Sequence, residues 1–147
     1  MDLRRLAAAD VSSVVQLWHA TKRATSDLLA SERDRTLDQD DAFFRAHILA
    51  CCEIWIAVAD GALLGFLATA GSYLDRLYVA PGAQRRGVGA ALFTQARTLS
   101  PTGIELHTHV KNHAARAFYE HQGCVPVHFG TSPAPENEPD VEYHWRP

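Results

Sequence analysis

The chain has 147 residues, of which 47% are hydrophobic and 21% charged, and its formal net charge is −3. These values exclude a disordered chain and indicate one domain spanning residues 1–147. A negative chain has no field that attracts phosphate backbones, so we expect no nucleic-acid partner. Three cysteines, two of them adjacent at Cys51 and Cys52, fit neither a disulfide framework nor a metal-ligand spacing and indicate a cytoplasmic location.

The first fifty residues are predicted to form one strand and two helices. A short strand at 3–6 precedes a helix that begins near residue 11, where apolar residues recur at helical spacing after Asp10 as the N-cap. Residues 19–35 are polar and only weakly periodic, and we interpret them as a loop. A capping box at 36–39 then predicts a second helix that carries apolar residues as far as Ile48.

A β-hairpin is predicted in the most apolar part of the chain. Two β-rich runs at 53–59 and 62–70 are joined by Asp60-Gly61, and both positions of such a turn need a positive φ. Glu53 and the turn interrupt the apolar stretch where a membrane-spanning helix would need unbroken apolar residues. We therefore expect no association with a membrane.

The second half of the chain alternates strands and helices. The predicted elements are a strand at 73–79, a helix at 88–99, a strand at 104–110, a helix at 112–122, and strands at 124–129 and 141–145. The order β-α-α-β-β-β-α-β-α-β-β combines hairpins with strand-helix-strand crossovers. It predicts an α+β, sandwich-like fold whose mixed, mostly antiparallel central sheet carries about four helices on its faces.

An anion site is predicted where the chain turns from the strand at 73–79 into the helix at 88–99. This turn contains residues 84–89, with the sequence QRRGVG. Unpaired N–H groups and the dipole at a helix start attract anions, and two arginines add charge beside them. The segment lacks the third glycine of a dinucleotide fingerprint and the Gly-Lys-Ser/Thr of a P-loop. It therefore indicates a different phosphorylated cofactor, unless the glycines only form a tight turn.

Three ordered pieces of the sequence match one known family. They are Leu77-Tyr78-Val79-Ala80-Pro81, then Gln84-x-x-Gly87-x-Gly89, and then Asn112-His113-x-Ala115-x-x-Phe118-Tyr119-Glu120-x-x-Gly123-Cys124. With this pattern the chain resembles the GNAT superfamily of N-acetyltransferases, as a small bacterial-type single-domain member. The resemblance covers residues 53–125, and the two ends of the chain match only in predicted element order. It implies the GNAT acyl-CoA N-acyltransferase fold.

The resemblance also implies a binding site for acetyl-CoA. In this family, the strand before the glycine loop bonds the pantetheine arm through its backbone, and the loop and helix start hold the pyrophosphate. The next helix approaches the far side of the cofactor arm. By motif position, the implied acetyl-CoA-binding residues are Leu77, Tyr78, Val79, Gln84, Arg85, Arg86, Gly87, Val88, Gly89, Asn112, Ala115 and Tyr119.

Tyr119 is the implied general acid. It matches the tyrosine that in many members of the family lies near the acetyl-CoA sulfur and protonates the leaving thiolate. A phenol has an ordinary pKa of about 10, so it is protonated at neutral pH and can donate to a developing thiolate. The alternative role is packing of the helix together with Phe118.

Asp75 is the candidate general base, because an attacking amine must lose a proton and the family often places the base on the strand before the cofactor loop. Glu105, His107 and His109 on the next predicted strand compete with it. Asp75 also has a plain alternative role as a solvated or salt-bridged strand carboxylate.

These features together predict an N-acetyltransferase that moves an acetyl group from acetyl-CoA to a primary amine of a small molecule, peptide or protein by direct attack. The alternative is a catalytically silent acyl-CoA-binding sensor or partner domain of the same fold, which an intact Tyr119 disfavours. The histidines lack a familiar ligand spacing, so no metal cofactor is expected. A homodimer is compatible with the sequence.

The acceptor amine is expected to enter between two irregular segments, residues 19–35 and residues 130–140. Both are long and free of predicted structure, and such segments commonly shape binding sites. The second segment contains Glu136, Glu138 and Asp140, whose charges would attract a cationic acceptor.

Overall fold

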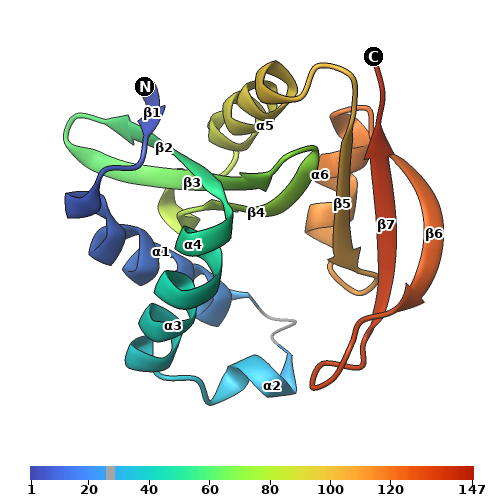
Figure 1. The fold of residues 1–147 in the computed structure, drawn as a ribbon, viewed down its shortest axis with the longest axis horizontal. Helices are drawn as coiled ribbons and strands as arrows, with labels where there is room; N and C mark the ends of the chain where they lie inside the picture. The colour runs from blue at the N-terminus through green and yellow to red at the C-terminus, as the bar shows by residue number, and fades with distance from the viewer. Residues whose placement is uncertain (26–28) are drawn as a thin grey trace.

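The computed structural model describes residues 1–25 and 29–147. Within them, seven strands form one mixed sheet in the order β1-β2-β3-β4-β5-β7-β6 (Figure 1). Neighbouring strands are antiparallel except for β4 and β5, which are parallel. The strands are β1 (Asp2–Arg5), β2 (Glu53–Ala59), β3 (Ala62–Ala70), β4 (Tyr73–Val79), β5 (Ile104–His109), β6 (Val125–Thr131) and β7 (Pro139–Trp145). The predicted α+β fold with a mostly antiparallel sheet is confirmed.

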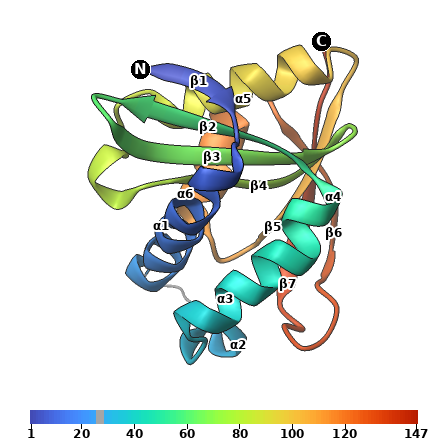
Figure 2. The same cartoon turned by 60° about the vertical axis from the view of Figure 1, so that its left-hand side comes forward.

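Helices cover both faces of this sheet. One face carries α1 and a continuous helical run of α3, a π-helical turn η2 and α4, whereas α5 and α6 lie on the other face (Figures 1 and 2). The helices are α1 (Val11–Ala24), α2 (Ala30–Arg33), α3 (Leu37–Phe43), η2 (Phe44–Ile48), α4 (Leu49–Cys51), α5 (Val88–Leu99) and α6 (His113–His121), with short 3-10 turns η1 (Ala8–Asp10) and η3 (Pro81–Ala83).

The sheet separates two apolar cores. Because side chains alternate along a strand, Phe66 and Leu67 of β3 lie in different cores, and both are fully buried. Phe66 packs with Trp18 and Phe44 beneath α1, and Leu67 packs with α5 and α6. Burial of one such side chain contributes about 1.5–3 kcal/mol. Each helix layer is therefore held to its face by apolar burial.

The sheet opens between β4 and β5. The two strands pair only at Tyr73 and Glu105, near the start of both. Beyond this point they diverge, and Figure 1 shows the half formed by β1 to β4 turning away from the half formed by β5, β7 and β6. The divergence leaves one edge of β4 without a strand partner over most of its length. An opening of this kind exposes backbone groups in the middle of a sheet.

Local signals in the sequence form as predicted at the hairpin and at the second helix. Asp60 and Gly61 have φ values of 52° and 77°, as a two-residue hairpin turn requires. Thr36 accepts the Gln39 amide and donates its own amide to the Gln39 side chain, which completes the capping box. Asp10 stands at the N-cap of α1, but its carboxylate accepts the Ala7 amide at 2.8 Å instead of an α1 amide.

The predicted loop at 19–35 is wrong over most of its described length. Helix α1 continues to Ala24, and α2 occupies Ala30–Arg33. The weak periodicity of apolar residues suggested a loop because it counts Lys22 as an exposed polar residue. Lys22 is buried, and its ammonium group bonds the carboxylates of Glu32 and Asp40. Its partners come from later in the chain, so local sequence could not reveal them. Residues 26–28 of this predicted loop lie outside the described residues.

The late loop is shorter than the predicted 130–140. Gly130 pairs with Asp140 and Thr131 with Pro139, so β6 and β7 continue as a ladder and the connection spans residues 132–138. Proline has no N–H to donate to a neighbouring strand, and the first position of a strand tolerates this loss. Pro139 can therefore begin β7.

The helices described at residues 1–25 and 29–147 are all too short or too polar to cross a lipid bilayer.

Candidate active site

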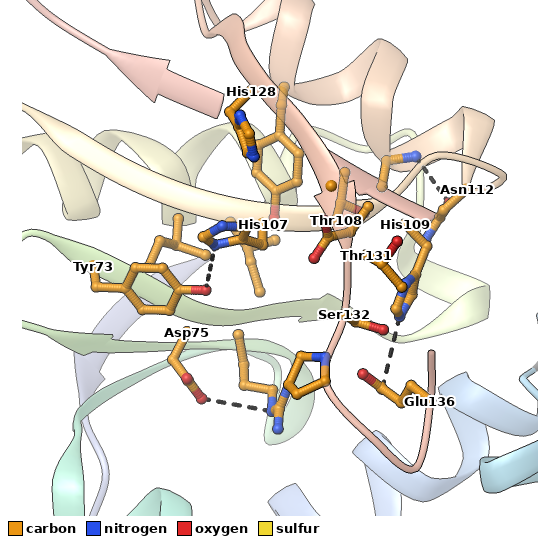
Figure 3. Close-up of a pocket in the computed structure, with 18 of the residues that line it drawn as sticks. Tyr73, Asp75, His107, Thr108, His109, Asn112, His128, Thr131, Ser132 and Glu136 are labelled. Atoms are coloured by element: carbon orange, nitrogen blue, oxygen red, sulfur yellow. Dashed lines mark hydrogen bonds and ion pairs between the residues drawn. The ribbon is translucent and has the colours of Figure 1, made fainter. Parts of the chain in front are cut away.

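A cavity of about 580 Å³ occupies the opening between β4 and β5 (Figure 3). Its walls come from β4, β5, the start of α6, and the end of β6 with the late loop. It brings together predicted site residues from distant parts of the chain. Among the sequence-predicted residues, those that line it are Asp75, Leu77, Tyr78, His107, His109, Asn112, Ala115, Tyr119, Glu136 and Asp140.

The cavity passes through the sheet. Leu74 and Tyr119 in its lining belong to the apolar core on the α5 and α6 face, whereas Tyr78 packs against the core beneath α1. Arg76 pairs with Ala68, a residue of that second core, and therefore points to the α1 face as well. Two molecules can thus meet inside the opening, one from each face of the sheet.

Tyr119 contributes its phenol from α6. The residue is 8% exposed, and burial, followed by the nearby Tyr78, Cys124 and Tyr73, raises the pKa of this phenol well above its ordinary value. The group is therefore protonated across the physiological pH range and can donate a hydrogen bond or a proton, whereas it cannot serve as a general base. Its ring also packs against Phe93 and Phe118, so the packing role that the sequence suggested is real and compatible with a donor role.

Asp75 lies at an irregularity of β4. Opposite the step from Ala68 to Thr69, the register passes from Arg76 to Leu74, which makes Asp75 the extra residue of a β-bulge. Bulges occur next to active sites because they re-aim a side chain. The carboxylate reaches the cavity, where its Oδ2 lies 3.6 Å from the Arg76 Nε, as Figure 3 shows.

The three competing bases have different surroundings. Glu105 lies outside the cavity lining and bonds Arg146 at 3.1 Å. His107 lines the cavity, with its Nδ1 3.0 Å from the Tyr73 hydroxyl. His109 also lines it, and its Nε2 lies 3.7 Å from a Glu136 oxygen. Figure 3 shows both contacts. Of the three competing bases, His107 and His109 thus line the cavity together with Asp75, whereas Glu105 does not.

The open edge of β4 offers backbone groups to a ligand. The Ala80 amide donates to the Leu64 carbonyl of β3 at 2.8 Å, so the alternation of a strand directs the polar backbone groups of Leu77 and Val79 to the opposite, open edge. Among the residues that the structure describes, only the Val79 carbonyl has a partner there, the side-chain amide of Gln84 at 3.2 Å. The backbone of Tyr78 faces β3, so its ring is the part that can contact a ligand in the cavity.

Residues 84–89 lie outside this cavity, at the start of α5. Gly87 is the N-cap with a φ of 82°, and no side chain of the described residues caps the first amides of α5. Arg85 has a φ of 63°, and the Arg86 side chain donates to the Gly82 carbonyl at 3.3 Å. Unsatisfied amides beside two cations fit the pyrophosphate of acetyl-CoA, and Val88 and Gly89 supply two of those amides.

The lack of a side chain at Gly89 is required by helix packing, and not by access of a phosphate. A Cβ placed on it would lie 3.0 Å from the Phe118 ring and 3.7 Å from Val79. The glycine therefore lets α5 pack closely against α6. At Gly87 a Cβ would meet open space, and only the left-handed backbone requires glycine there.

Helix α6 presents the last two predicted cofactor contacts. Asn112 is its N-cap and accepts the Ala115 amide at 3.1 Å, which fixes the start of the helix at the cavity wall. The small side chain of Ala115 leaves room for a ligand between α6 and β4. Both residues line the cavity with Tyr119.

Five lining residues were not predicted from the sequence, namely Tyr73, Leu74, Arg76, Thr108 and His128. Four more lie in the segment 130–140 that was expected to shape the acceptor entrance, namely Gly130, Thr131, Ser132 and Pro133. Arg76 is adjacent to a predicted residue, but its exposure to the opening depends on how β4 and β5 diverge. No local pattern carries that information. Among residues 1–25 and 29–147, no three His, Cys, Asp or Glu side chains are grouped as metal ligands.

Comparisons with known proteins show which family the chain is similar to. The model of the acetyltransferase (GNAT) family matches residues 14–124. The peptidyl-lysine N-acetyltransferase YjaB of Salmonella typhimurium is 27% identical over 84% of this chain and 82% of its own length. The peptidyl-lysine N-acetyltransferase YiaC of Escherichia coli is 40% identical over 54% of each chain.

A solved structure shares the fold over nearly the whole chain. The solution structure of apo YjaB from Escherichia coli has a TM-score of 0.80, covers 97% of this chain and 95% of its own, and is 23% identical in sequence. The family match extends over most of the chain, including β4, β5 and α6, which line the cavity. The protein therefore belongs to the acetyltransferase (GNAT) family and is an acetyl-CoA-dependent acyltransferase.

Proposed function

We propose that the protein transfers the acetyl group of acetyl-CoA to a primary amine of a peptide, a protein or a small molecule. The observation that carries this proposal is the buried phenol of Tyr119 in a cavity that crosses the sheet at the open edge of β4. The cofactor would lie on the α5 and α6 face, with its phosphates at residues 84–89. The amine would approach from the α1 face.

In this proposal Tyr119 donates its proton to the sulfur as the bond from sulfur to the acetyl carbon breaks. Burial makes the phenol a weaker acid, but it also makes a thiol harder to ionise, because both charged forms lose hydration. The buried thiol of Cys124 illustrates this, since burial raises its pKa to about 11. Donor and acceptor in the same partly buried cavity are therefore shifted in the same direction, and the transfer stays feasible.

Asp75 is the proposed base that accepts, through water, the proton released by the attacking amine. We expect Asp75→Asn to lower kcat by about 100-fold at neutral pH and to leave the Kd of acetyl-CoA unchanged. Raising the pH should restore much of the rate, because a lysine amine with an ordinary pKa of about 10.4 then arrives already deprotonated. Steady-state assays of CoA release at a series of pH values would measure this recovery of kcat.

Glu105→Gln is the matched control, because Glu105 is a strand carboxylate outside the cavity. A loss in Asp75→Asn that high pH does not restore would mean that Asp75 only positions its neighbours. The proton acceptor would then be sought at His107 or His109.

The proposed cofactor contacts can be tested separately from turnover. We expect Arg85→Ala combined with Arg86→Ala to raise the Kd of acetyl-CoA by roughly 10- to 100-fold, since a charge-assisted hydrogen bond contributes about 1.5–3 kcal/mol. Isothermal titration calorimetry would measure it. Replacing Arg23 and Arg45 by alanine removes the same charge elsewhere and should leave the Kd unchanged. If the two double variants bind alike, the phosphates do not lie at residues 84–89.

The acceptor is proposed to be a primary amine such as a protein lysine, which is the group named for the relatives YjaB and YiaC. Glu136 and Asp140 line the cavity and would attract an ammonium group, whereas Glu138 bonds Lys111 at 3.5 Å and is not in the lining. The direct test is CoA release with lysine peptides, peptide N-termini and small amines. Acetyl-CoA binding without CoA release from any of them would indicate a silent acyl-CoA-binding domain.

A further inference from the structure

Arg76 is a cation inside the cavity that lacks a hydrogen-bond partner among the described residues. Its Nε is buried and donates no hydrogen bond within the described residues, and the Asp75 Oδ2 lies 3.6 Å from it. The Asp75 and Arg76 side chains are 32% and 30% exposed, and ion pairs with this much exposure are weak. The guanidinium therefore keeps its capacity to bind a carboxylate in the two-pronged geometry that arginine favours.

The guanidinium is held in place by the ring of Trp18. Its central carbon lies 5.6 Å from the centre of that ring, which is 3% exposed and lies against Lys22 Nζ at 3.8 Å. A guanidinium that lies over a buried aromatic ring is attracted to it, and it loses little further freedom when it binds an anion. The contact with the ring thus places a cation at the cavity before any ligand arrives.

Two cavities meet at Arg76. The second one, of about 470 Å³, lies between α1, α2 and the late loop, and it shares Arg76, Tyr78, His109, Asn112, Pro133 and Glu136 with the first. At this junction the Nδ1 of His109 is also buried without a hydrogen-bond partner among the described residues. A group bound at the junction lies beside the site of transfer, within reach of the Arg76 guanidinium and beside the His109 ring.

The junction is on the acceptor side of the sheet. Arg76 stacks on α1, whereas residues 84–89 and Tyr119 belong to the α5 and α6 face. The cofactor phosphates and the Arg76 guanidinium are thus assigned to opposite faces. An anion at Arg76 should come from the acceptor.

Other charges around the junction do not cancel this cation. Lys22 and Arg35 in the second cavity are matched by Asp40 and Glu32, to which they are bonded or close. Glu136 faces His109 at 3.7 Å. The junction is thus lined by both signs of charge, with Arg76 available to an anion and Glu136 able to attract an approaching cation.

Resting on the proposed function, we propose that Arg76 selects acceptors in which the reactive amine stands next to a carboxylate, such as a lysine beside an acidic residue. The carboxylate binds the guanidinium, and the amine then lies in the cavity between Asp75 and Tyr119. The arrangement makes an acidic neighbour part of the recognised substrate.

The experiment compares matched peptides. Acetyl-capped peptides with a single lysine carry either Glu or Gln at the position before it, or at the position after it. Their kcat/KM values are measured by CoA release, and their Kd values by calorimetry in the presence of CoA. For at least one of the two positions, we expect the Glu peptide to exceed the Gln peptide about tenfold in kcat/KM, with the difference in KM and a smaller ratio at high salt.

Three variants make the test specific. Arg76→Gln should reduce the Glu-to-Gln ratio to about one, and Arg76→Lys should retain part of it, because lysine keeps the charge without the planar fork. Both should bind acetyl-CoA as the unchanged protein does. Arg45→Gln, which alters an exposed ion pair with Asp41 on α3, should keep the full ratio.

Equal values for the Glu and Gln peptides in the unchanged protein would overturn the inference, and so would an unchanged ratio in Arg76→Gln. Loss of acetyl-CoA affinity in Arg76→Gln with an intact ratio would assign the guanidinium to the cofactor and overturn it as well. If no peptide is acetylated but the Kd ratio is present and depends on Arg76, the proposed function fails and the acidic-neighbour site stands.

Discussion

Replacing Tyr119 by phenylalanine should lower kcat by roughly 100-fold while the Kd of acetyl-CoA stays within about twofold of its original value. The substitution keeps the ring that packs against Phe93 and Phe118 and removes only the hydroxyl. The thiolate would then leave without a proton donor in a cavity where burial makes its charge costly. Single-turnover measurements of CoA release would separate this chemical step from binding and product release.

Tyr143→Phe is a matched control for that substitution. Tyr143 is fully buried and its ring lies 6.4 Å from that of Tyr119, but its hydroxyl bonds Arg116 at 3.1 Å and it is absent from the cavity lining. Its loss should change stability more than kcat. A fall in kcat of less than threefold in Tyr119→Phe would make Tyr119 a packing residue and leave another donor, or water, to protonate the sulfur.

Asp40→Asn should destabilise the fold by about 3–5 kcal/mol, because it removes the anion from a buried group of cations. Asp40 is fully buried, and its carboxylate lies 2.7 Å from His19 Nδ1, 2.8 Å from Arg35 Nε and 3.0 Å from Lys22 Nζ. These contacts join α1 to α3 beneath the second cavity. Urea unfolding followed by circular dichroism would measure the loss as a lower midpoint with an unchanged slope.

Asp41→Asn supplies the control, since Asp41 and its partner Arg45 are half-exposed and their pair contributes about 0–1 kcal/mol. Comparable destabilisation by the two substitutions would show that the Asp40 network contributes no more than a surface pair. The stability of α1 and α3 would then rest on the apolar core alone.

The contribution of Asp40 should also depend on pH in a definite direction. Burial raises the pKa of this carboxyl, but the hydrogen bonds from Arg35, His19 and Lys22 outweigh burial and hold it below its usual value. A depressed folded-state pKa means that the stabilisation is complete above the unfolded pKa of about 3.9 and is lost as the pH falls through the folded value. The difference between the unchanged protein and Asp40→Asn should therefore shrink below about pH 4.

Short-range signals account for the elements that the sequence predicted well. The Asp60-Gly61 turn, the capping box at Thr36 and the glycine loop before α5 are each defined by residues within a few positions of one another. Their physics is local, since it concerns positive φ values and the unpaired amides at helix starts. The ordered family pieces added Tyr119 and the strand that lies at the opening, because their spacing reflects a shared fold.

Errors arose where distant residues decide local structure. Lys22 is polar, yet α1 continues past it because Glu32 and Asp40 compensate its charge. The late loop is short because β6 and β7 continue their ladder through Gly130 and Asp140. In each case the stabilising partner is ten or more residues away, which a reading of local periodicity does not detect.

The sequence by itself determined the α+β class, the order of the elements, the glycine loop at the start of α5 and the candidate acid Tyr119, because these depend on local backbone chemistry and on motif spacing. Only the tertiary structure decided how the site is assembled. The single pairing of Tyr73 with Glu105 opens the sheet, the bulge at Asp75 turns a carboxylate into that opening, and the Trp18 ring holds Arg76 beside it. These features depend on how strands diverge and on side chains that meet across the sheet, and those contacts exist only once the chain has folded.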